Sequence, residues 1–388
     1  MKNFIFHNPT KIIFGEGTVS QIGNEAKPYG RKVMMVYGVS SIKKSGLYDR
    51  VIASIQEAGL EIVEYSGVKS NPVLSHLNKG IELAKKEKVD FILAVGGGSV
   101  LDESKAIAAG AMTDGNVWDF FTGDDEIKAA LPVLTVLTIP ATGSEMNGGT
   151  VITNDETSQK YGFIDPHLLP KMSILDPTLT FTVSPAYTAY SGVDAIAHAI
   201  EGYFTHKDEW APIQDRLVEN LVQIIMESTE RILKDPRDYQ GRATFMWAAT
   251  LAWNGLATAG VGDIGVPMHL LEHPLSGIYD IAHGAGLSIT IPAWMKWKSK
   301  KDVKKLARFA ENVLGIKAGS PELTAEKGIS ALKEWFDKIG SPTSFAAAGI
   351  PESDIDMIAD NTRKLAEIWD LNDYTKDVIV ELYRMCLD

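Results

Sequence analysis

The sequence predicts a parallel α/β domain followed by an all-helical domain. From Lys32 to about Asp176, short runs rich in apolar and β-branched residues alternate with amphipathic stretches. This alternation is typical of a parallel sheet covered by helices on both faces. After about Ser184, long helical periodicities dominate and the strand-like runs fade. The length of 388 residues is sufficient for two such domains.

The individual elements follow from these patterns. Four buried strands are predicted at 33–37, 61–65, 91–95 and 132–139. Helices are predicted up to Ala58 and at 73–88, 100–111, 212–234 and 301–314. Ser184-Pro185 is typical of a helix start, because Ser caps well and Pro is tolerated in the first turn. The boundary is therefore placed at 183/184, which gives domains 1–183 and 184–388.

Composition excludes several classes of protein. Lys and Arg number 38 and Asp and Glu number 50, so the net charge is 38 − 50 = −12. Such a charge disfavours nucleic acids and anionic membranes as partners. Cys386 is the single cysteine of the sequence, so no internal disulfide can form. We find no apolar stretch of secretory-signal length at the N-terminus, and we expect a cytoplasmic protein.

Residues 243–262 form the longest uncharged stretch that we considered as a membrane span. The stretch contains threonines, three glycines and an Asn254-Gly255 step. We interpret it as a buried helix in a helical core, broken near that step.

The strongest motif of the first half is AVGGGSVLDESK, at 94–105. A buried strand leads into three glycines, and a helix follows directly. Glycines let backbone N–H groups approach an anion closely, and a helix N-terminus favours negative charge. The loop Gly96-Gly97-Gly98-Ser99 is therefore a candidate site for a phosphate or pyrophosphate. An alternative is a tight turn in which Ser99 and Asp102 form a capping box, and both interpretations can hold together.

Two further polar clusters are expected at strand ends, where a parallel sheet opens its ligand crevice. One is TIPATGSE, which offers Thr138, Thr142 and Ser144, and the other is Lys160 in SQKYGFIDP. Taken alone, each cluster is more typical of turn chemistry than of a ligand contact.

Five of the eight histidines lie between 198 and 283. Asp194 and His198 are four residues apart, as are His269 and His273, so each pair lies on one helix face. His283 follows after a short loop. Together these side chains could bind one divalent metal, although spacing leaves open which of the downstream histidines coordinate. Fe(II) is favoured, with Zn(II) as a substitute, because Fe(II) accepts a substrate oxygen beyond four protein ligands.

At this point the chain resembles the iron-containing alcohol dehydrogenase family, in particular its butanol dehydrogenase and aldehyde reductase branch. The resemblance covers nearly the whole chain and rests on NPTKIIFGEG, GGGSVLD, TIPATGSE, GVDAIAHAIE and the H-x3-H-x9-H pattern of 269–283. It implies a Rossmann-like N-terminal domain, a helical C-terminal domain and a dehydroquinate synthase-like architecture, with the active site in the interdomain cleft. A homodimer is a further expectation from the family.

The resemblance also implies roles for individual residues. Asp194, His198, His269 and His283 match the metal ligands, whereas His273 matches a residue beside the metal and is the candidate proton relay. Gly97, Gly98 and Ser99 match pyrophosphate contacts. Thr138, Thr142 and Lys160 match residues that line the ribose and diphosphate of the cofactor.

The expected activity is a metal-dependent, NAD(P)-linked interconversion of short aliphatic primary alcohols and aldehydes. The metal would polarise the substrate oxygen, and the nicotinamide would exchange the hydride. Glycerol dehydrogenase or dehydroquinate synthase chemistry on the same fold is the nearest alternative. A metallohydrolase, with the glycine loop as a mere turn, is a more distant one.

A preference for NADP(H) over NAD(H) is predicted from the residues that follow the strand at 33–37. An acidic residue at such a position commonly binds the adenosine 2′-hydroxyl and repels a 2′-phosphate. No acidic residue occurs there before Asp49. The candidate cofactor contacts are Gly38, Ser40, Ser41 and Lys43. The small residues leave space, and the lysine offsets phosphate charge.

Overall fold

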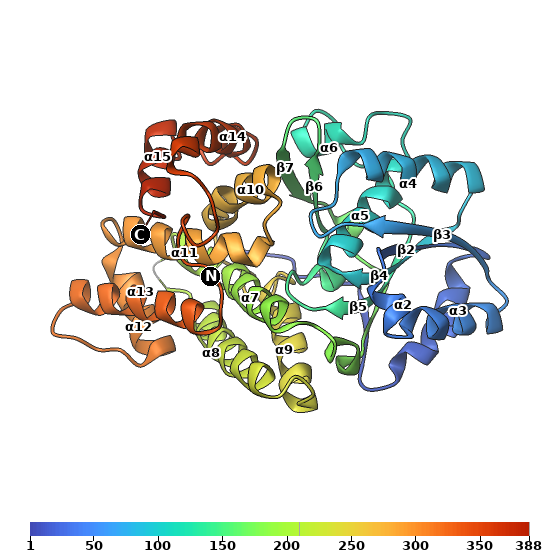
Figure 1. Ribbon diagram of the computed structural model, residues 1–388, viewed down its shortest axis with the longest axis horizontal. Helices are drawn as coiled ribbons and strands as arrows, with labels where there is room; N and C mark the ends of the chain where they lie inside the picture. The colour runs from blue at the N-terminus through green and yellow to red at the C-terminus, as the bar shows by residue number, and fades with distance from the viewer. Residues whose placement is uncertain (209, 388) are drawn as a thin grey trace. The chain divides into compact units, whose positions relative to one another are not determined.

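The computed structural model describes residues 1–208 and 210–387, which divide into two compact units (Figure 1). The α/β unit contains His7–Val183 and Pro236–Thr250. The helical unit contains Met1–Phe6, Ser184–Asp235 and the chain from Leu251 onwards.

A six-stranded sheet is the centre of the α/β unit. Its strands are β1 (Lys11–Phe14), β2 (Lys32–Gly38), β3 (Glu61–Val68), β4 (Phe91–Gly97), β5 (Val133–Ile139) and β8 (Met172–Leu175). All neighbouring strands run parallel, in the spatial order β1-β8-β5-β4-β2-β3. The predicted parallel α/β fold and its four strands are confirmed. The sequence pattern does not reveal β1 and β8, which are only four residues long.

Helices cover both faces of this sheet (Figure 1). They are α1 (Ile22–Ala26), α2 (Ser41–Lys44), α3 (Leu47–Glu57), α4 (Leu74–Glu87) and α5 (Gly98–Gly110), whereas α6 (Trp118–Thr122) packs against β7 (Gln159–Ile164) of a separate hairpin. On one face, Val33 and Met35 of β2 pack in a core with Val51 and Ile55 of α3. Helix α5 covers the other face and contacts α4. Burial on both faces explains why β2 and β4 are apolar without alternation.

The strand order reverses between β2 and β4, which are direct neighbours. The chain continues from β2 to β3 on one side and returns to β4 on the other. Such a switch point opens a crevice at the carboxyl ends of the strands, and this crevice is the usual ligand site of an open α/β sheet. Gly38 ends β2 and Gly97 ends β4, so the two candidate nucleotide-binding segments flank this point.

Lys160 does not follow a strand of the parallel sheet. It lies in β7 (Gln159–Ile164), which pairs with β6 (Gly149–Asn154) in a separate antiparallel hairpin. The expected position at a strand end of the parallel sheet is therefore wrong. Thr138 does lie near the carboxyl end of β5.

The helical unit contains no strand among its described residues. Its helices are α7 (Pro185–Thr205), α8 (Pro212–Lys234), α10 (Pro267–Tyr279), α11 (His283–Ser299), α12 (Val303–Leu314), α13 (Pro321–Lys338), α14 (Ile355–Ile368) and α15 (Lys376–Arg384). One short 3₁₀ helix, Glu352–Asp354, also belongs to this unit. The other short 3₁₀ helices lie in the α/β unit, at Thr18–Gln21, Lys27–Tyr29, Ser144–Met146, Pro166–Leu168 and Pro177–Thr180. The predicted helix start is confirmed, because the Ser184 hydroxyl accepts a hydrogen bond from the Tyr187 N–H at 3.2 Å.

Helix α9 (Tyr239–Ala252) corrects the interpretation of residues 243–262. The helix ends just before Asn254, and Gly255 has a left-handed φ of 88°, so the break falls where it was predicted. However, residues 236–250 pack with the α/β unit rather than in a helical core. In the described part of the chain, no helix is long and apolar enough to cross a membrane.

A buried charged cluster lies behind the glycine loop. The Lys105 ammonium on α5 donates to the Ser144 hydroxyl at 2.8 Å and to the carbonyl oxygens of Asn147 and Gly149 at 2.8 and 2.9 Å. The Ser144 hydroxyl in turn donates to Asp102 at 2.6 Å. Burial raises the pKa of Asp102 to about 6 and lowers that of Lys105 to about 8. The cluster ties α5 to the segment that follows β5. Asp102 therefore does not form the capping box considered above.

We expect Lys105→Met to lower the free energy of unfolding by about 3 kcal/mol, because it leaves the Asp102 carboxylate buried without its cation. Chemical denaturation of both proteins measures this loss. A carboxyl group whose pKa is raised on folding lowers the free energy of unfolding as the pH rises above the pKa that the group has in the unfolded chain. The loss should therefore be smaller at pH 5 than at pH 8. Lys86→Met, at an exposed lysine of α4, is the control and should change little.

Candidate functional site

Helix α7 positions the first two candidate metal ligands. Asp194 and His198 lie one turn apart on this helix, and their side chains are almost fully buried. The Asp194 Oδ1 and His198 Nδ1 atoms are 3.3 Å apart. A lone carboxylate would be costly in such a setting, so the surroundings must compensate its charge.

Helices α10 and α11 supply the histidines of the second motif. His269 lies in the first turn of α10 and His273 one turn later, whereas His283 is the first residue of α11. Pro267 begins α10, where the missing N–H of proline has no consequence. The two helices are packed against each other and against α7.

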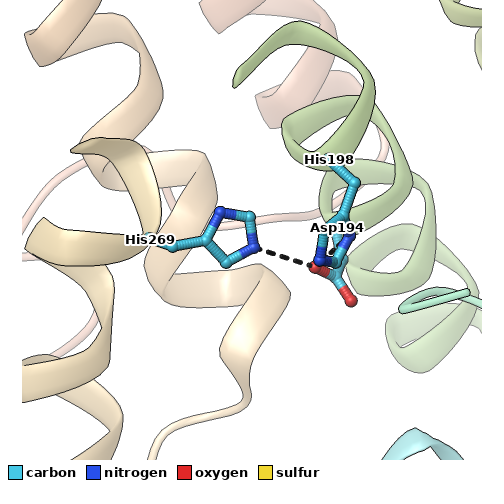
Figure 2. A group of neighbouring side chains, drawn as sticks. All are labelled: Asp194, His198 and His269. Carbon is cyan, nitrogen blue, oxygen red and sulfur yellow. Dashed lines mark ion pairs between the residues drawn. The ribbon is translucent and has the colours of Figure 1, made fainter. Parts of the chain in front are cut away.

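The four predicted ligands gather around one carboxylate oxygen. The Nε2 atoms of His283 and His269 lie 3.6 and 3.8 Å from Asp194 Oδ1. Figure 2 shows Asp194, His198 and His269, with the rings on opposite helices pointing toward the carboxylate. The structure thus brings Asp194, His198, His269 and His283 together within one unit.

The donor atoms of this cluster fit a divalent cation. Asp194 Oδ1, His198 Nδ1 and His269 Nε2 are buried and have no hydrogen-bond partner of normal geometry among the described residues. Buried polar atoms rarely remain unsatisfied in native proteins, so three that converge on one point indicate an occupant. One carboxylate oxygen with imidazole nitrogens is a suitable donor set for Fe(II) or Zn(II).

The histidines of the metal-free cluster differ in their protonation. Burial lowers the pKa of His198 to about 3, so this ring is neutral and can donate a lone pair to a metal. Burial also opposes ionisation of Asp194, but the nearby His198 and His269 hold its pKa below the usual range. Burial alone would lower the pKa of His269, but the carboxylates of Asp194 and Glu201 raise it to about 9, so this ring must release a proton when a metal binds.

His273 lies at the edge of the cluster. Its ring centroid is 5.5 Å from that of His283, 6.2 Å from that of His269 and 5.2 Å from that of Trp369. His273 also belongs to a second group of potential metal ligands with Glu272 and His283, whose donor atoms lie within 4.8 Å of one another. The arrangement is compatible with a residue that stands beside a metal without binding it.

The cluster also includes two buried glutamates, Glu201 and Glu272, which were not predicted from the sequence. Glu201 Oε1 accepts a hydrogen bond from His269 Nδ1 at 2.9 Å, and Glu272 Oε2 bonds to His283 Nδ1. Both glutamates are fully buried. Helical spacing provides a signal for both, because Glu201 is three residues after His198 and Glu272 is three residues after His269.

In the α/β unit, the glycines of the candidate phosphate loop are tightly packed. A Cβ atom at Gly96 would lie 2.5 Å from the Val100 side chain, and one at Gly98 would lie 2.6 Å from Thr142. Packing alone therefore requires small residues here, and the run of glycines does not by itself indicate a phosphate. The N-terminus of α5 at Gly98 still presents backbone N–H groups that lack intrahelical partners.

The other predicted nucleotide-binding residues lie around this loop. Ser99 donates a hydrogen bond to the Ser70 carbonyl, and Thr142 Oγ1 accepts one from the Ser144 N–H at 3.1 Å. Thr138 is half-buried on β5. The buried Lys160 ammonium donates to Asn71 Oδ1 at 3.1 Å. Asn71 is a polar residue that the sequence reasoning missed, because it lies in a loop without a motif.

An acidic side chain from another strand, Glu64, lies beside the segment that follows β2. Gly38, Ser40 and Ser41 lead into α2, and the Lys43 ammonium lies over the rings of Tyr37 and Tyr48, at 5.3 and 4.7 Å. The hydroxyls of the same two tyrosines donate to the Glu64 carboxylate, at 2.6 and 2.9 Å. Glu64 comes from β3, so the fold adds a negative charge that reading residues 37–49 could not anticipate.

Comparison with known families identifies the same family as the sequence motifs. The family described as "Iron-containing alcohol dehydrogenase" matches residues 9–177, and "Fe-containing alcohol dehydrogenase family, C-terminal" matches residues 188–387. The chain therefore belongs to the iron-containing alcohol dehydrogenase family, a group of oxidoreductases. The family that the motifs suggested is confirmed.

Individual relatives are similar over the full chain. The chain is 42% identical to the "Probable NADH-dependent butanol dehydrogenase 1" of Bacillus subtilis, with 100% of both chains covered. It is 38% identical to the "NADPH-dependent aldehyde reductase YqhD" of Escherichia coli, with 99% of both covered. The crystal structure of an NADH-dependent butanol dehydrogenase A from Thermotoga maritima superposes with a TM-score of 0.96 at 46% identity, covering 100% of this chain and 99% of the other.

The cluster predicts distinct outcomes for its histidines. His198→Ala should lose both bound metal and turnover, because the remaining ligands hold a labile divalent ion poorly. His273→Ala should keep the metal and slow turnover. Elemental analysis of the metal content, together with steady-state kinetics, measures both effects.

His167→Ala is the matched control, because His167 is an exposed histidine of the α/β unit. It should retain metal and activity. If His273→Ala loses its metal while His283→Ala keeps it, the assignment of these two residues is wrong.

Proposed function

We propose that the protein is a metal-dependent, NAD(P)-linked alcohol dehydrogenase and aldehyde reductase that acts on short aliphatic primary alcohols and aldehydes. The observation that carries the proposal is the convergence of three buried donor atoms, from Asp194, His198 and His269, at one point in the helical unit. Membership of the iron-containing alcohol dehydrogenase family and the names of the similar proteins support the same reaction.

The proposed metal is Fe(II), with Zn(II) as a substitute, held by Asp194, His198, His269 and His283. When bound, the metal supplies Lewis-acid polarisation of the substrate oxygen, and the nicotinamide supplies or accepts the hydride. The donor atoms of Asp194, His198 and His269 are buried from water, which strengthens the electrostatic interactions there.

His273 is the proposed proton relay. Its ring lies next to that of His283, and imidazole changes protonation near neutral pH. The role proposed for His273 is to hold or release the proton that the alcohol oxygen loses or gains during turnover.

The α/β unit is the proposed nucleotide-binding part of the protein. Gly97, Gly98 and Ser99 at the start of α5 are proposed to bind the pyrophosphate, with Thr138, Thr142 and Lys160 beside the ribose and diphosphate. The position of this loop at the switch point of the sheet supports the proposal. A homodimer is also proposed, supported by the exposed apolar residues Phe4, Ile5 and Phe6 at the N-terminus.

Aldehyde-dependent oxidation of NADPH and NADH tests the activity directly. Protein loaded with Fe(II) should turn over butanal and other aldehydes of two to six carbons. Removal of the metal by a chelator should abolish turnover, and Fe(II) should restore it. Absence of turnover with every aldehyde in the series would contradict the proposal. A titration of NADPH fluorescence separates it from a metallohydrolase, which needs no nicotinamide.

We further propose that NADP(H) is preferred, with Gly38, Ser40, Ser41 and Lys43 around the adenosine 2′-phosphate. The absence of an acid from residues 37–48 and the position of Lys43 support this preference. The two tyrosine hydroxyls that bond to Glu64 partly satisfy its charge. The names of the similar proteins include both cofactors, so kinetics must decide.

The ratio of kcat/KM for NADPH to that for NADH should exceed one in the unmodified protein. Gly38→Asp should shift the ratio toward NADH, since a carboxylate repels the 2′-phosphate. Lys43→Met should lower kcat/KM for NADPH selectively, and the neighbouring Lys44→Met is the matched control. A ratio of one or below in the unmodified protein would show that this preference is wrong.

A further inference from the structure

Two of the three histidines in the metal cluster are held by buried glutamates, and the third is not. His269 Nδ1 is bonded to Glu201, and His283 Nδ1 is bonded to Glu272. His198 has no glutamate partner among the described contacts, and its ring packs near that of Trp253 instead. The bond at Nδ1 leaves Nε2 of His269 and His283 directed toward Asp194, at 3.8 and 3.6 Å.

Glu201 is fixed by more than the imidazole. Its Oε1 atom also accepts hydrogen bonds from the backbone N–H groups of Met268 and His269, at 3.0 and 2.9 Å. These groups belong to the first turn of α10, where N–H groups lack intrahelical partners. A carboxylate of α7 thus caps α10 and orients the ring of His269 with the same oxygen.

Glu272 is fixed by a hydroxyl and by the close approach of a helix. Ser276 donates a hydrogen bond to its Oε1 atom, and His283 bonds to its Oε2 atom. Helix α11 passes directly over this carboxylate at Gly286. A Cβ atom on Gly286 would lie 2.6 Å from Oε1, 2.7 Å from Cγ and 3.0 Å from Cδ of Glu272. The glycine is therefore required by the position of the glutamate side chain.

We infer that Glu201 and Glu272 are positioning residues, which hold His269 and His283 with Nε2 directed at the metal, and that Gly286 acts through Glu272. This inference rests on the proposed metal site. A carboxylate behind a ligating histidine selects the tautomer, fixes the ring and makes the nitrogen a better donor. Loss of such a partner typically weakens metal affinity by about 10- to 100-fold.

Gly286→Ala is the sharpest test, because it touches no ligand. Alanine favours a helix more than glycine does, so α11 itself should not be weakened. The new methyl group displaces the flexible Glu272 side chain rather than backbone. We expect the Zn²⁺ affinity of the protein, measured by competition with a chromophoric chelator and without nucleotide, to fall about tenfold or more. The melting temperature of the metal-free protein should change little.

Glu272→Ala and the double variant complete a mutant cycle. Removing the glutamate should weaken Zn²⁺ binding and also make room for the methyl group. Gly286→Ala should therefore have little further effect in the Glu272→Ala background, which a general destabilisation would not produce. Glu272→Gln keeps an acceptor oxygen and should retain more affinity than Glu272→Ala.

Two control variants match these changes elsewhere in the chain. Gly319→Ala places a methyl group in open space. Glu103→Gln alters another buried glutamate bonded to a histidine, His76, in the α/β unit. Both should leave Zn²⁺ affinity unchanged.

The outcomes separate this inference from the proposed function. If the unmodified protein binds Zn²⁺ tightly but Gly286→Ala and Glu272→Ala bind equally well, the positioning role is overturned and the metal site stands. Additive effects in the cycle would also overturn the link from Gly286 to Glu272. If the unmodified protein binds no Zn²⁺, the proposed metal site fails, and this inference fails with it.

Discussion

The Asp194 carboxylate is the constraint around which the helical unit is arranged. A charge buried this deeply is unfavourable unless opposite charge or strong donors surround it. The surrounding groups are imidazoles from three helices, and each approaches within 4 Å of the same carboxylate oxygen. Two of these rings are in turn bonded to further buried carboxylates. Such a set of groups has excess negative charge, which the proposed divalent cation would compensate.

This requirement explains several local features that would otherwise look unrelated. Gly286 is small because Glu272 occupies the space above it, and Gly284 is small because a Cβ atom there would lie 2.0 Å from the Tyr190 carbonyl oxygen. Both contacts bring the start of α11 close to its neighbours. Glu201 caps α10 from α7, so the geometry of that helix start depends on the same carboxylate that orients His269. The glycines of α11 and the capping of α10 by Glu201 of α7 thus determine where the imidazoles point.

In the α/β unit, close packing and a buried pair of charged residues also determine the local structure around the glycine loop. Its glycine loop is shaped by packing against Thr142 and Val100, while Lys105 fastens the segment after β5 to the helix that the loop begins. Burying Lys105 and Asp102 shifts both groups toward their neutral forms, so this connection is maintained at some cost in stability.

The sequence alone determined the fold class, four of the six strands of the parallel sheet, the helix start at Ser184 and the family, because these depend on local periodicity, capping and contiguous motifs. It also indicated Asp194, His198, His269 and His273 through their i, i+4 spacing, and His283 through its position shortly after the second pair. Only the tertiary structure decided what lies behind them. Glu64 reaches Tyr37 from a neighbouring strand, Glu201 reaches His269 from another helix, and Gly286 contacts Glu272 across a helix pair. Partners that are distant in sequence become neighbours only through packing, so a local pattern can place Glu201 or Glu272 on a helix face but cannot record which histidine each one contacts.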